Sequence, residues 1–202
     1  MTKIKETISS IKSINPIFYE KAQNRLDNLT KPQGSLGRLE EFAQRIVAIT
    51  ENMNPVIDKK IIFTFAGDHG VAEEGVSLFP KEVTPQMVLN FIRGGAGINV
   101  LARHAGIEVK VVDIAVDYEF GNLDGLLHKK VIRGTKNIRK GSAMTRDEAI
   151  KCIEVGIDLA DEYAKNGYHI FGTGEMGIAN TTPSSAIAAI FSKRTVSEVT
   201  GR

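Results

Sequence analysis

A glycine-rich segment near residue 175 combines the features of a phosphate-binding loop with a single carboxylate. From Gly172 to Thr182 the sequence reads Gly-Thr-Gly-Glu-Met-Gly-Ile-Ala-Asn-Thr-Thr. Glycines let a backbone approach a ligand closely. Thr182-Pro183 is typical of a helix cap and first turn, and the free N–H groups of a helix N-terminus suit an anion such as phosphate. Glu175 does not fit that interpretation, because a carboxylate does not favour phosphate binding. A separate role is therefore needed to explain Glu175.

A second polar pair, Asp68-His69, follows the apolar run Ile61–Ala66. We expect this pair and the glycine-rich segment to follow parallel strands, whose carboxyl ends meet at one edge of a sheet. Asp68, His69 and Glu175 are therefore possible neighbours. Asp68 and His69 could take part in catalysis, or they could be loop residues whose hydrogen bonds fix a turn. We expect no metal site, because no His, Cys or carboxylate cluster with ligand spacing surrounds them.

The segment from Gly75 to Met87 could hold a flat apolar ligand. Apolar residues alternate there with Ser77 and Gln86, and such a lining suits a heterocycle that needs one or two oriented hydrogen bonds. A loop that covers the sheet explains the pattern equally well. The chain has neither a GxxxxGK[ST] phosphate loop nor a Gx[SC]xG nucleophile elbow.

Alternating strand and helix patterns predict the elements that position these residues. Strands are expected at Ile61–Ala66, Glu108–Ala115 and Tyr168–Phe171, and helices at Thr84–Ile92, Gly97–Gly106 and Thr145–Gly167. In the last helix, which opens with a Thr-x-x-Glu capping box, Ala149, Ile153 and Ile157 are expected to face inward. The sequence therefore predicts an α/β fold, with a parallel Rossmann-like sheet and helices on both faces.

The first part of the chain has a different pattern. Two amphipathic helices are expected at 16–29 and 36–49, joined by the turn-forming residues Lys31–Ser35. We therefore predict a small helical subdomain at 1–53, followed by an α/β domain at 54–202.

Composition narrows the class of protein. Of the 202 residues, 42% are hydrophobic and 25% charged, and the net charge is +2 with scattered basic residues, so nucleic acid is not an expected partner. The chain has one cysteine, Cys152, no signal-peptide pattern and no apolar run long enough to span a membrane. These features predict a soluble cytoplasmic protein without a membrane segment.

Four ordered segments closely resemble one enzyme family. They are Leu29–Leu39, Phe65–Val71, Gly75–Thr84 (Gly-Val-Ser, Pro80 and Glu-Val-Thr) and Gly172–Thr182. Together they resemble nicotinate-nucleotide–dimethylbenzimidazole phosphoribosyltransferase, which acts in assembly of the cobalamin lower ligand. The resemblance implies attack of 5,6-dimethylbenzimidazole on C1′ of nicotinate mononucleotide, giving α-ribazole 5′-phosphate and nicotinate. It also implies no cofactor or metal, and a homodimer.

The resemblance also implies roles for particular residues. Glu175 would be catalytic, beside the azole, where it accepts the N–H or stabilises developing positive charge. The remaining residues implied to bind substrate, around the azole or at the ribose and phosphate, are Val76, Ser77, Phe79, Gln86, Gly174, Met176, Gly177, Asn180, Thr181 and Thr182. Asp68 and His69 are further candidates at the same site.

The chain departs from the family in length. Family members are considerably longer, and their usual general base lies in a C-terminal part that would begin beyond Arg202. The α/β phosphoribosyltransferase domain at 54–202 is therefore expected to be incomplete, with an exposed sheet edge and uncovered apolar surface. We expect the 202 residues alone to be inactive or very weak as an enzyme, and the alternative function is a non-catalytic azole- or nucleotide-binding module.

Overall fold

A computed structural model describes residues 3–201 of the chain. The expectation that the family's general base lies beyond Arg202 concerns a segment outside these residues, so the structure does not test it. The chain divides into two compact units, of which the first ends at Asp58 and the second begins at Lys59. The sequence placed this boundary after Met53, within the segment that follows the last helix of the first unit.

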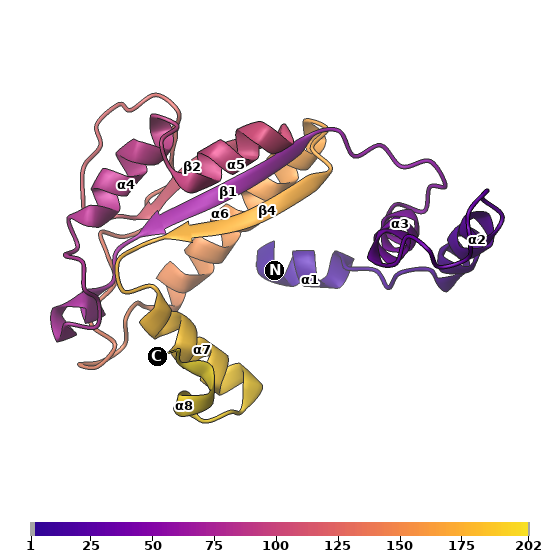
Figure 1. The fold of residues 1–202 in the computed structure, drawn as a ribbon. Coiled ribbons are helices and arrows are strands. Elements are labelled where there is room, and N and C mark those ends of the chain that lie inside the picture. The colour runs from indigo at the N-terminus through magenta and orange to yellow at the C-terminus, as the bar shows by residue number, and fades with distance from the viewer. Residues whose placement is uncertain (1–2, 202) are drawn as a thin grey trace. The chain divides into compact units, whose positions relative to one another are not determined.

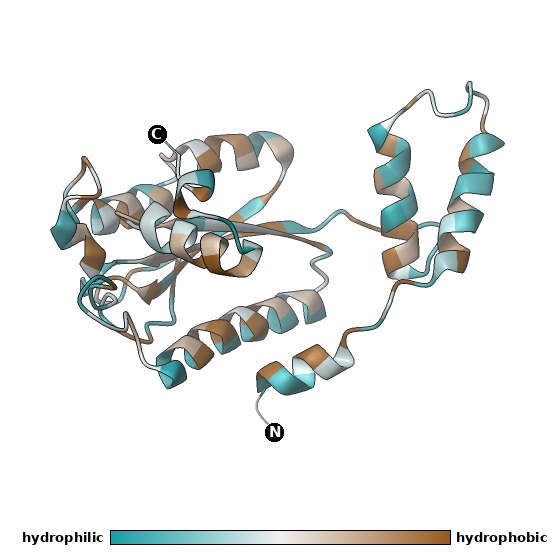
Figure 2. Ribbon diagram, turned by 90° about the horizontal axis from the view of Figure 1, so that it is seen from below, coloured by the Kyte–Doolittle hydropathy of each residue, from teal (hydrophilic) through white to brown (hydrophobic). Residues whose placement is uncertain are grey.

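The first unit is helical. It contains α1 (Lys3–Ser10), α2 (Pro16–Asp27) and α3 (Arg38–Thr50). Asn15 caps α2 by accepting a hydrogen bond from the Ile17 N–H, and Pro16 occupies the first turn, where it needs no donor. Each helix of the α2–α3 hairpin carries apolar and polar residues (Figure 2), and Ala22, Val47 and Ala48 are buried.

The second unit has one four-stranded parallel sheet in the order β3-β2-β1-β4. Its elements are β1 (Lys60–Gly67), η1 (Gly70–Glu74), α4 (Val83–Ile92), α5 (Gly97–Ala105), β2 (Glu108–Ala115), β3 (Leu126–His128), α6 (Arg146–Lys165), β4 (Ile170–Met176), α7 (Thr181–Ser192) and α8 (Val196–Val199). The predicted α/β class with a parallel sheet is confirmed (Figure 1).

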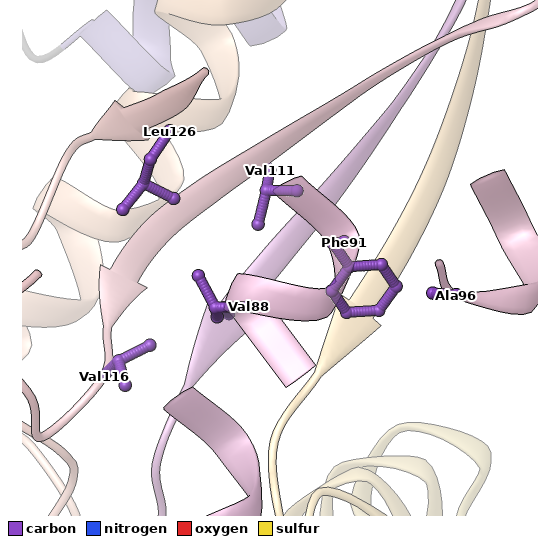
Figure 3. Close-up of a cluster of buried hydrophobic side chains, with 7 residues drawn as sticks. Val88, Phe91, Ala96, Val111, Val116 and Leu126 are labelled. Atoms are coloured by element: carbon purple, nitrogen blue, oxygen red, sulfur yellow. The ribbon is translucent and has the colours of Figure 1, made fainter. Parts of the chain in front are cut away.

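Helices cover both faces of the central strands (Figure 1), as the near-continuous apolar run of β1 requires. On one face Val88 and Phe91 of α4 pack against Ala66 and Val111 of the sheet (Figure 3). On the other face Leu159 of α6 packs with the side chains of Ile61, Phe63 and Val112.

The structure corrects three details of the sequence prediction. Residues 172–176, expected to be loop, are the second half of β4. The short strand β3 was not predicted, because three residues carry too little pattern. In α6 the inward stripe runs through Val155, Leu159 and Tyr163, whereas Ile153 is 54% exposed; the expected inward face was therefore wrong. The predicted capping box at Thr145 and Glu148 is confirmed.

The edge of the sheet at β4 is poorly covered. Most residues of β4 are exposed or half-buried, and every residue of α7 is at least partly exposed. Ile187, Ile190 and Phe191 of α7 are exposed large apolar side chains. This agrees with the expected exposed edge and apolar surface. Among the helices within residues 3–201, none is long and apolar enough to cross a membrane.

Candidate active site

The carboxyl ends of β1 and β4 bring the two polar segments together. The strands are parallel and adjacent, with Phe65 in register with Glu175. Beyond the strand ends, the Nε2–H of His69 donates a hydrogen bond to Oδ1 of Asn180, with 2.6 Å between the two atoms, because an amide oxygen can only accept. The sequence motif that follows β1 is therefore in direct contact with the glycine-rich segment.

A cavity of about 290 Å³ lies at this contact. Asp68, His69, Glu175 and Asn180 line it, so the structure places the three expected neighbours around one space. The rest of the lining is largely apolar and comes from the strand ends, the loop between β3 and α6, α6 itself and the first turns of α7: Phe65, Gly67, Ile114, Ala115, Thr135, Met144, Cys152, Pro183, Ser184 and Ile187. Polar groups that converge in a mostly apolar cavity are typical of a small-molecule site.

Glu175 borders a second space on the opposite face of β4. A groove of about 400 Å³ runs along the α4 side of the strand, lined by Gly172, Gly174 and Glu175 together with Met87 and Phe91 among others. Gly172 and Gly174 have no side chains to fill it, and a Cβ on Gly172 would lie 2.7 Å from Cγ1 of Ile62. The exposed carboxylate therefore lies where two open surfaces meet.

The turn that follows β4 is tightly packed. A Cβ on Gly177 would lie 2.1 Å from the carbonyl oxygen of Gly67 and 2.2 Å from Oδ1 of Asn180, so this position requires glycine. Ala179 has a φ of 71°, a left-handed conformation that is uncommon for a residue with a side chain. Thr84 of α4 accepts a hydrogen bond from the Ile178 N–H at 3.0 Å.

Helix α7 begins differently from the sequence prediction. Thr182-Pro183 was expected to form the cap and first-turn pair, but the N-cap residue is Asn180 and the helix starts at Thr181. The side chain of Asn180 contacts His69 rather than capping the helix. Thr181 is exposed and Thr182 half-buried.

The glycines have the G-x-G-x-x-G spacing of dinucleotide-binding proteins, but they are not placed as in that motif. In the dinucleotide motif the glycines form the turn between a strand and a helix. Here Gly172 and Gly174 lie inside β4 and Gly177 lies in the turn. The close approach of Gly177 is to the backbone of Gly67, within the protein.

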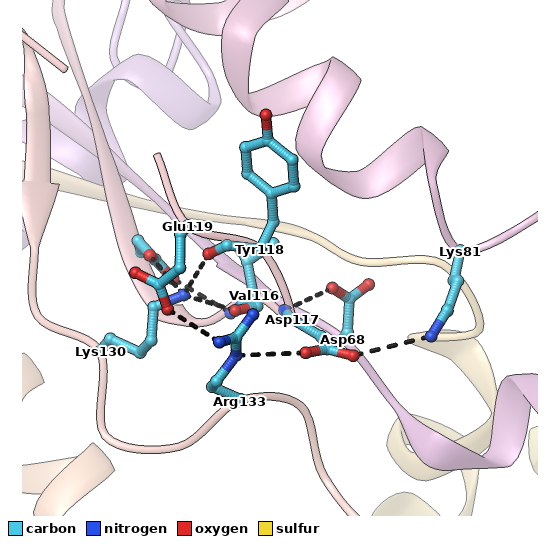
Figure 4. A network of polar contacts seen from close by, with 9 residues as sticks. Asp68, Lys81, Val116, Asp117, Tyr118, Glu119, Lys130 and Arg133 are labelled. Carbon is cyan, nitrogen blue, oxygen red and sulfur yellow. Dashed lines mark hydrogen bonds and ion pairs between the residues drawn. The ribbon is translucent and has the colours of Figure 1, made fainter. Parts of the chain in front are cut away.

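Asp68 connects the ends of β1 and β2. It is 7% exposed, and its Oδ2 accepts a hydrogen bond from the Asp117 N–H at 2.8 Å. Its backbone N–H donates to Ala115 and its carbonyl accepts from the Thr135 N–H. These bonds fix the turn that follows β1, as the loop-fixing interpretation of Asp68 expects, and Figure 4 shows the bond from Asp117.

Beside Asp68, charged side chains border a further cavity of about 400 Å³. Asp117 forms ion pairs with Lys81 at 3.6 Å and with Arg133 at 3.3 Å, as Figure 4 shows. Phe79, an expected substrate-binding residue, lines this cavity with Asp68 and His69.

Four other residues that were expected to bind substrate lie outside these cavities. Ser77 is half-buried, and its hydroxyl accepts a hydrogen bond from the Phe79 N–H at 3.2 Å. Val76 is exposed, and Gln86 lies on the exposed side of α4. Met176 packs against the apolar cluster beneath α4, so its side chain contributes to the core of the unit.

Carboxylates also hold the loop that borders the site. The Asn137 side chain donates to Glu74 at 2.7 Å, Arg139 forms an ion pair with the same carboxylate, and Lys140 pairs with Glu73 at 2.7 Å. The hydrogen bonds from Asn137 and Arg139 hold the pKa of Glu74 below its ordinary value, and Lys140 does the same for the pKa of Glu73.

Sequence reasoning missed several residues that shape the site. Thr84 stood in a recognised segment but was not assigned a role, and its bond to Ile178 spans 94 residues. Arg133, Thr135 and Asn137 lie on a loop with no pattern that would mark them. Within residues 3–201, no three His, Cys, Asp or Glu side chains are arranged to hold a metal ion.

Comparison with known proteins identifies the family. Residues 11–202 match a family model described as phosphoribosyltransferase. Nicotinate-nucleotide–dimethylbenzimidazole phosphoribosyltransferases from Geobacter sulfurreducens and Geotalea uraniireducens are 61% and 60% identical over 202 residues. The crystal structure of CobT from Thermus thermophilus matches with a TM-score of 0.89 and 42% identity, over 93% of this chain and 56% of that chain.

These matches cover all or nearly all of this chain but only part of each relative. The two curated relatives are matched over 100% of this chain and 57% of their own length. The resemblance inferred from the four sequence segments is confirmed by the family model and by these relatives. The chain belongs to the nicotinate-nucleotide–dimethylbenzimidazole phosphoribosyltransferase family, and it spans about 57% of the length of the curated relatives that it matches.

Proposed function

We propose that the protein transfers the phosphoribosyl group of nicotinate mononucleotide to 5,6-dimethylbenzimidazole, in assembly of the cobalamin lower ligand. The products are α-ribazole 5′-phosphate and nicotinate. The observation that carries this proposal is the hydrogen bond between His69 and Asn180, which joins two family segments around the cavity that Glu175 lines. The family and the names of its curated members support the choice of substrates.

The reaction needs alignment and the removal of one proton. An azole nitrogen attacks C1′ of the ribose while the bond from C1′ to the nicotinate nitrogen breaks, and nicotinate leaves with that electron pair. The attacking azole then loses its N–H proton. Holding two planar rings on opposite sides of C1′ supplies much of the rate enhancement in such a step, and a nearby carboxylate that takes the proton supplies a further part.

In this proposal Glu175 faces the azole. It is exposed and borders both the 290 Å³ cavity and the groove along β4, so a ring in either space can reach its carboxylate. Gly174, Gly177, Asn180, Thr181 and Thr182 contact ribose and phosphate. Val76, Ser77, Phe79 and Gln86 belong to the azole side, and Asp68 and His69 hold the boundary between the azole and the ribose phosphate.

The first test is a Glu175→Gln variant of the full-length protein, meaning a protein that carries these 202 residues and has the length of the curated relatives. We expect formation of α-ribazole 5′-phosphate, measured by chromatography, to slow by roughly 10²-fold, because glutamine cannot accept the azole proton. Glu162→Gln, an exposed carboxylate on α6, is the matched control and should keep the wild-type rate. Absence of product from the wild-type protein would contradict the function, and an unchanged rate in Glu175→Gln would give Glu175 a structural role.

A second candidate is a binding module without turnover, formed by these 202 residues themselves. The exposure of Glu175 and of α7 favours it, because a site open on this side excludes little water. Calorimetry with 5,6-dimethylbenzimidazole, with and without nicotinate mononucleotide, separates the two candidates when combined with the product assay. Binding by the 202-residue chain without product would support the module. The homodimer and the cytoplasmic location remain predictions from the sequence and the resemblance.

A further inference from the structure

Thr84 is a fully buried residue that joins α4 to the glycine-rich segment. Its exposed fraction is 0%, and its Oγ1 accepts the hydrogen bond from the Ile178 N–H at 3.0 Å. Thr84 lies in the first turn of α4, directly after the loop that carries Ser77 and two residues before Gln86. One hydrogen bond therefore connects the segment proposed for the azole with the turn proposed for ribose and phosphate.

The turn that Thr84 contacts is conformationally demanding. Ala179 holds a φ of 71°, and Gly177 approaches the Gly67 carbonyl so closely that no side chain fits. A left-handed residue other than glycine persists where the surrounding structure over-determines it. The bond from Thr84 to Ile178, next to Ala179, is one such restraint, and the contact between His69 and Asn180 is another.

The hydroxyl of Thr84, rather than its volume, supplies the restraint. Valine has nearly the same shape but no acceptor, so it would leave the buried N–H of Ile178 unpaired. An unpaired buried donor is costly, and the turn can recover the cost by moving toward water. Such a movement would carry Asn180 away from His69, because Asn180 lies in the same turn, two residues after Ile178.

We propose that Thr84 is a positioning residue, which holds the turn at 177–180 so that Asn180 meets His69 at a fixed distance from α4. The hydrogen bonds of Thr84 with Ile178 and of His69 with Asn180 support the positioning of the turn. The effect of that positioning on binding of nicotinate mononucleotide rests on the function proposed above. Thr84 touches no substrate in this proposal and acts through Ile178 and Asn180.

The structural test compares Thr84→Val with Thr84→Ser in the full-length protein. We expect the amide of Ile178 to exchange its hydrogen roughly 10-fold faster in Thr84→Val, because its acceptor is gone. Serine keeps the hydroxyl, so Thr84→Ser should restore slow exchange. Amides at the centre of β1 serve as an internal reference for global unfolding. Equal exchange at Ile178 in wild type and Thr84→Val, with β1 unchanged, would overturn the proposal.

The kinetic test uses the same two variants. In Thr84→Val we expect the KM for nicotinate mononucleotide to rise by roughly 10-fold, with a smaller change in the KM for 5,6-dimethylbenzimidazole. A residue that served stability alone would lower the amount of active enzyme and leave both KM values unchanged, and that outcome contradicts the proposal. If the wild-type protein makes no product, the proposed function fails, while the exchange experiment still decides the role of Thr84.

Discussion

Two parallel strands of the same sheet, β1 and β4, are held in opposite ways. β1 lies between helices on both faces, and its residues Ile61, Phe63 and Ala66 are buried. β4 pairs with β1 along its length, yet most of its residues are exposed or half-buried. β1 is therefore fixed by side-chain packing, whereas β4 is fixed by backbone pairing and by the turn at its carboxyl end.

The difference follows from the residues of the two strands. β1 reads Lys-Ile-Ile-Phe-Thr-Phe-Ala-Gly, and β4 reads Ile-Phe-Gly-Thr-Gly-Glu-Met. Glycines at 172 and 174 offer no apolar surface to a covering helix, so they leave the groove that Glu175 borders. The residues proposed for chemistry thus lie on the strand that packs least, and the turn at 177–180 sets their position.

The largest effect should come from removing packing at the centre of the sheet. Leu159→Ala removes a side chain that is 1% exposed and packs on Ile61 and Val112. We expect it to lower the free energy of unfolding of the 202-residue chain by about 3 kcal/mol. Phe191→Ala, at an 84% exposed position on α7, should change it by less than about 0.5 kcal/mol. Denaturant titration measures both, and similar losses would show that α7 is packed as firmly as the centre.

A smaller loss of unfolding free energy is expected from a change in the turn at 177–180, which holds the exposed strand β4. Gly177→Ala would force a Cβ against the Gly67 carbonyl, and such overpacking costs about 1–3 kcal/mol. Gly141→Ala is the matched control, since its Cβ would meet nothing within 4 Å and we expect a change within about 0.5 kcal/mol. Thermal unfolding measures the loss, and NMR of the His69 imidazole reports whether Asn180 has moved. A tolerated Gly177→Ala would mean that the turn does not set the position of β4.

The same contrast explains how much the sequence could predict. The bounds of β2 and the capping box of α6 were readable from local pattern, because a short segment rich in valine and isoleucine is typical of a strand and Thr-x-x-Glu is typical of a helix start. The second half of β4 could not be predicted in this way, because glycine, threonine and glutamate are typical of a loop. This segment forms a strand because it pairs with β1.

Long-range contacts limited what could be predicted about the site. Asp68, His69 and Glu175 were expected to be neighbours because parallel strands end at one edge, a rule that needs no detail of the loops. The bond between Thr84 and Ile178 and the pairing of Glu74 with Asn137 depend on loop conformations that no local pattern specifies. Their partners lie 94 and 63 residues away along the chain.

The smallest expected effect concerns the loop at 136–140, which ionised carboxylates of η1 help to hold. Glu74 and Glu73 have pKa values below the ordinary 4.5, caused first by Asn137 and by Lys140 respectively. A carboxylate whose folded-state pKa is lowered contributes stability above its unfolded pKa, and this stability is lost as the pH falls through the folded value. The attachment of this loop should therefore be complete near neutral pH and should weaken below pH 4.5.

Limited proteolysis between about pH 7 and about pH 3.5, with an acid-tolerant protease, measures this attachment. We expect cleavage within 136–143 to increase as the pH falls below about 4.5, before cleavage in β1 or β2 begins, because packed strands do not depend on those carboxylates. In a Glu73→Gln and Glu74→Gln double variant the loop should be cleaved at a rate that no longer changes over this range. Cleavage of loop and strands at the same pH would show that the loop unfolds together with the centre of the sheet. The contrast between a packed centre and a less packed periphery would then apply to β4 but not to this loop.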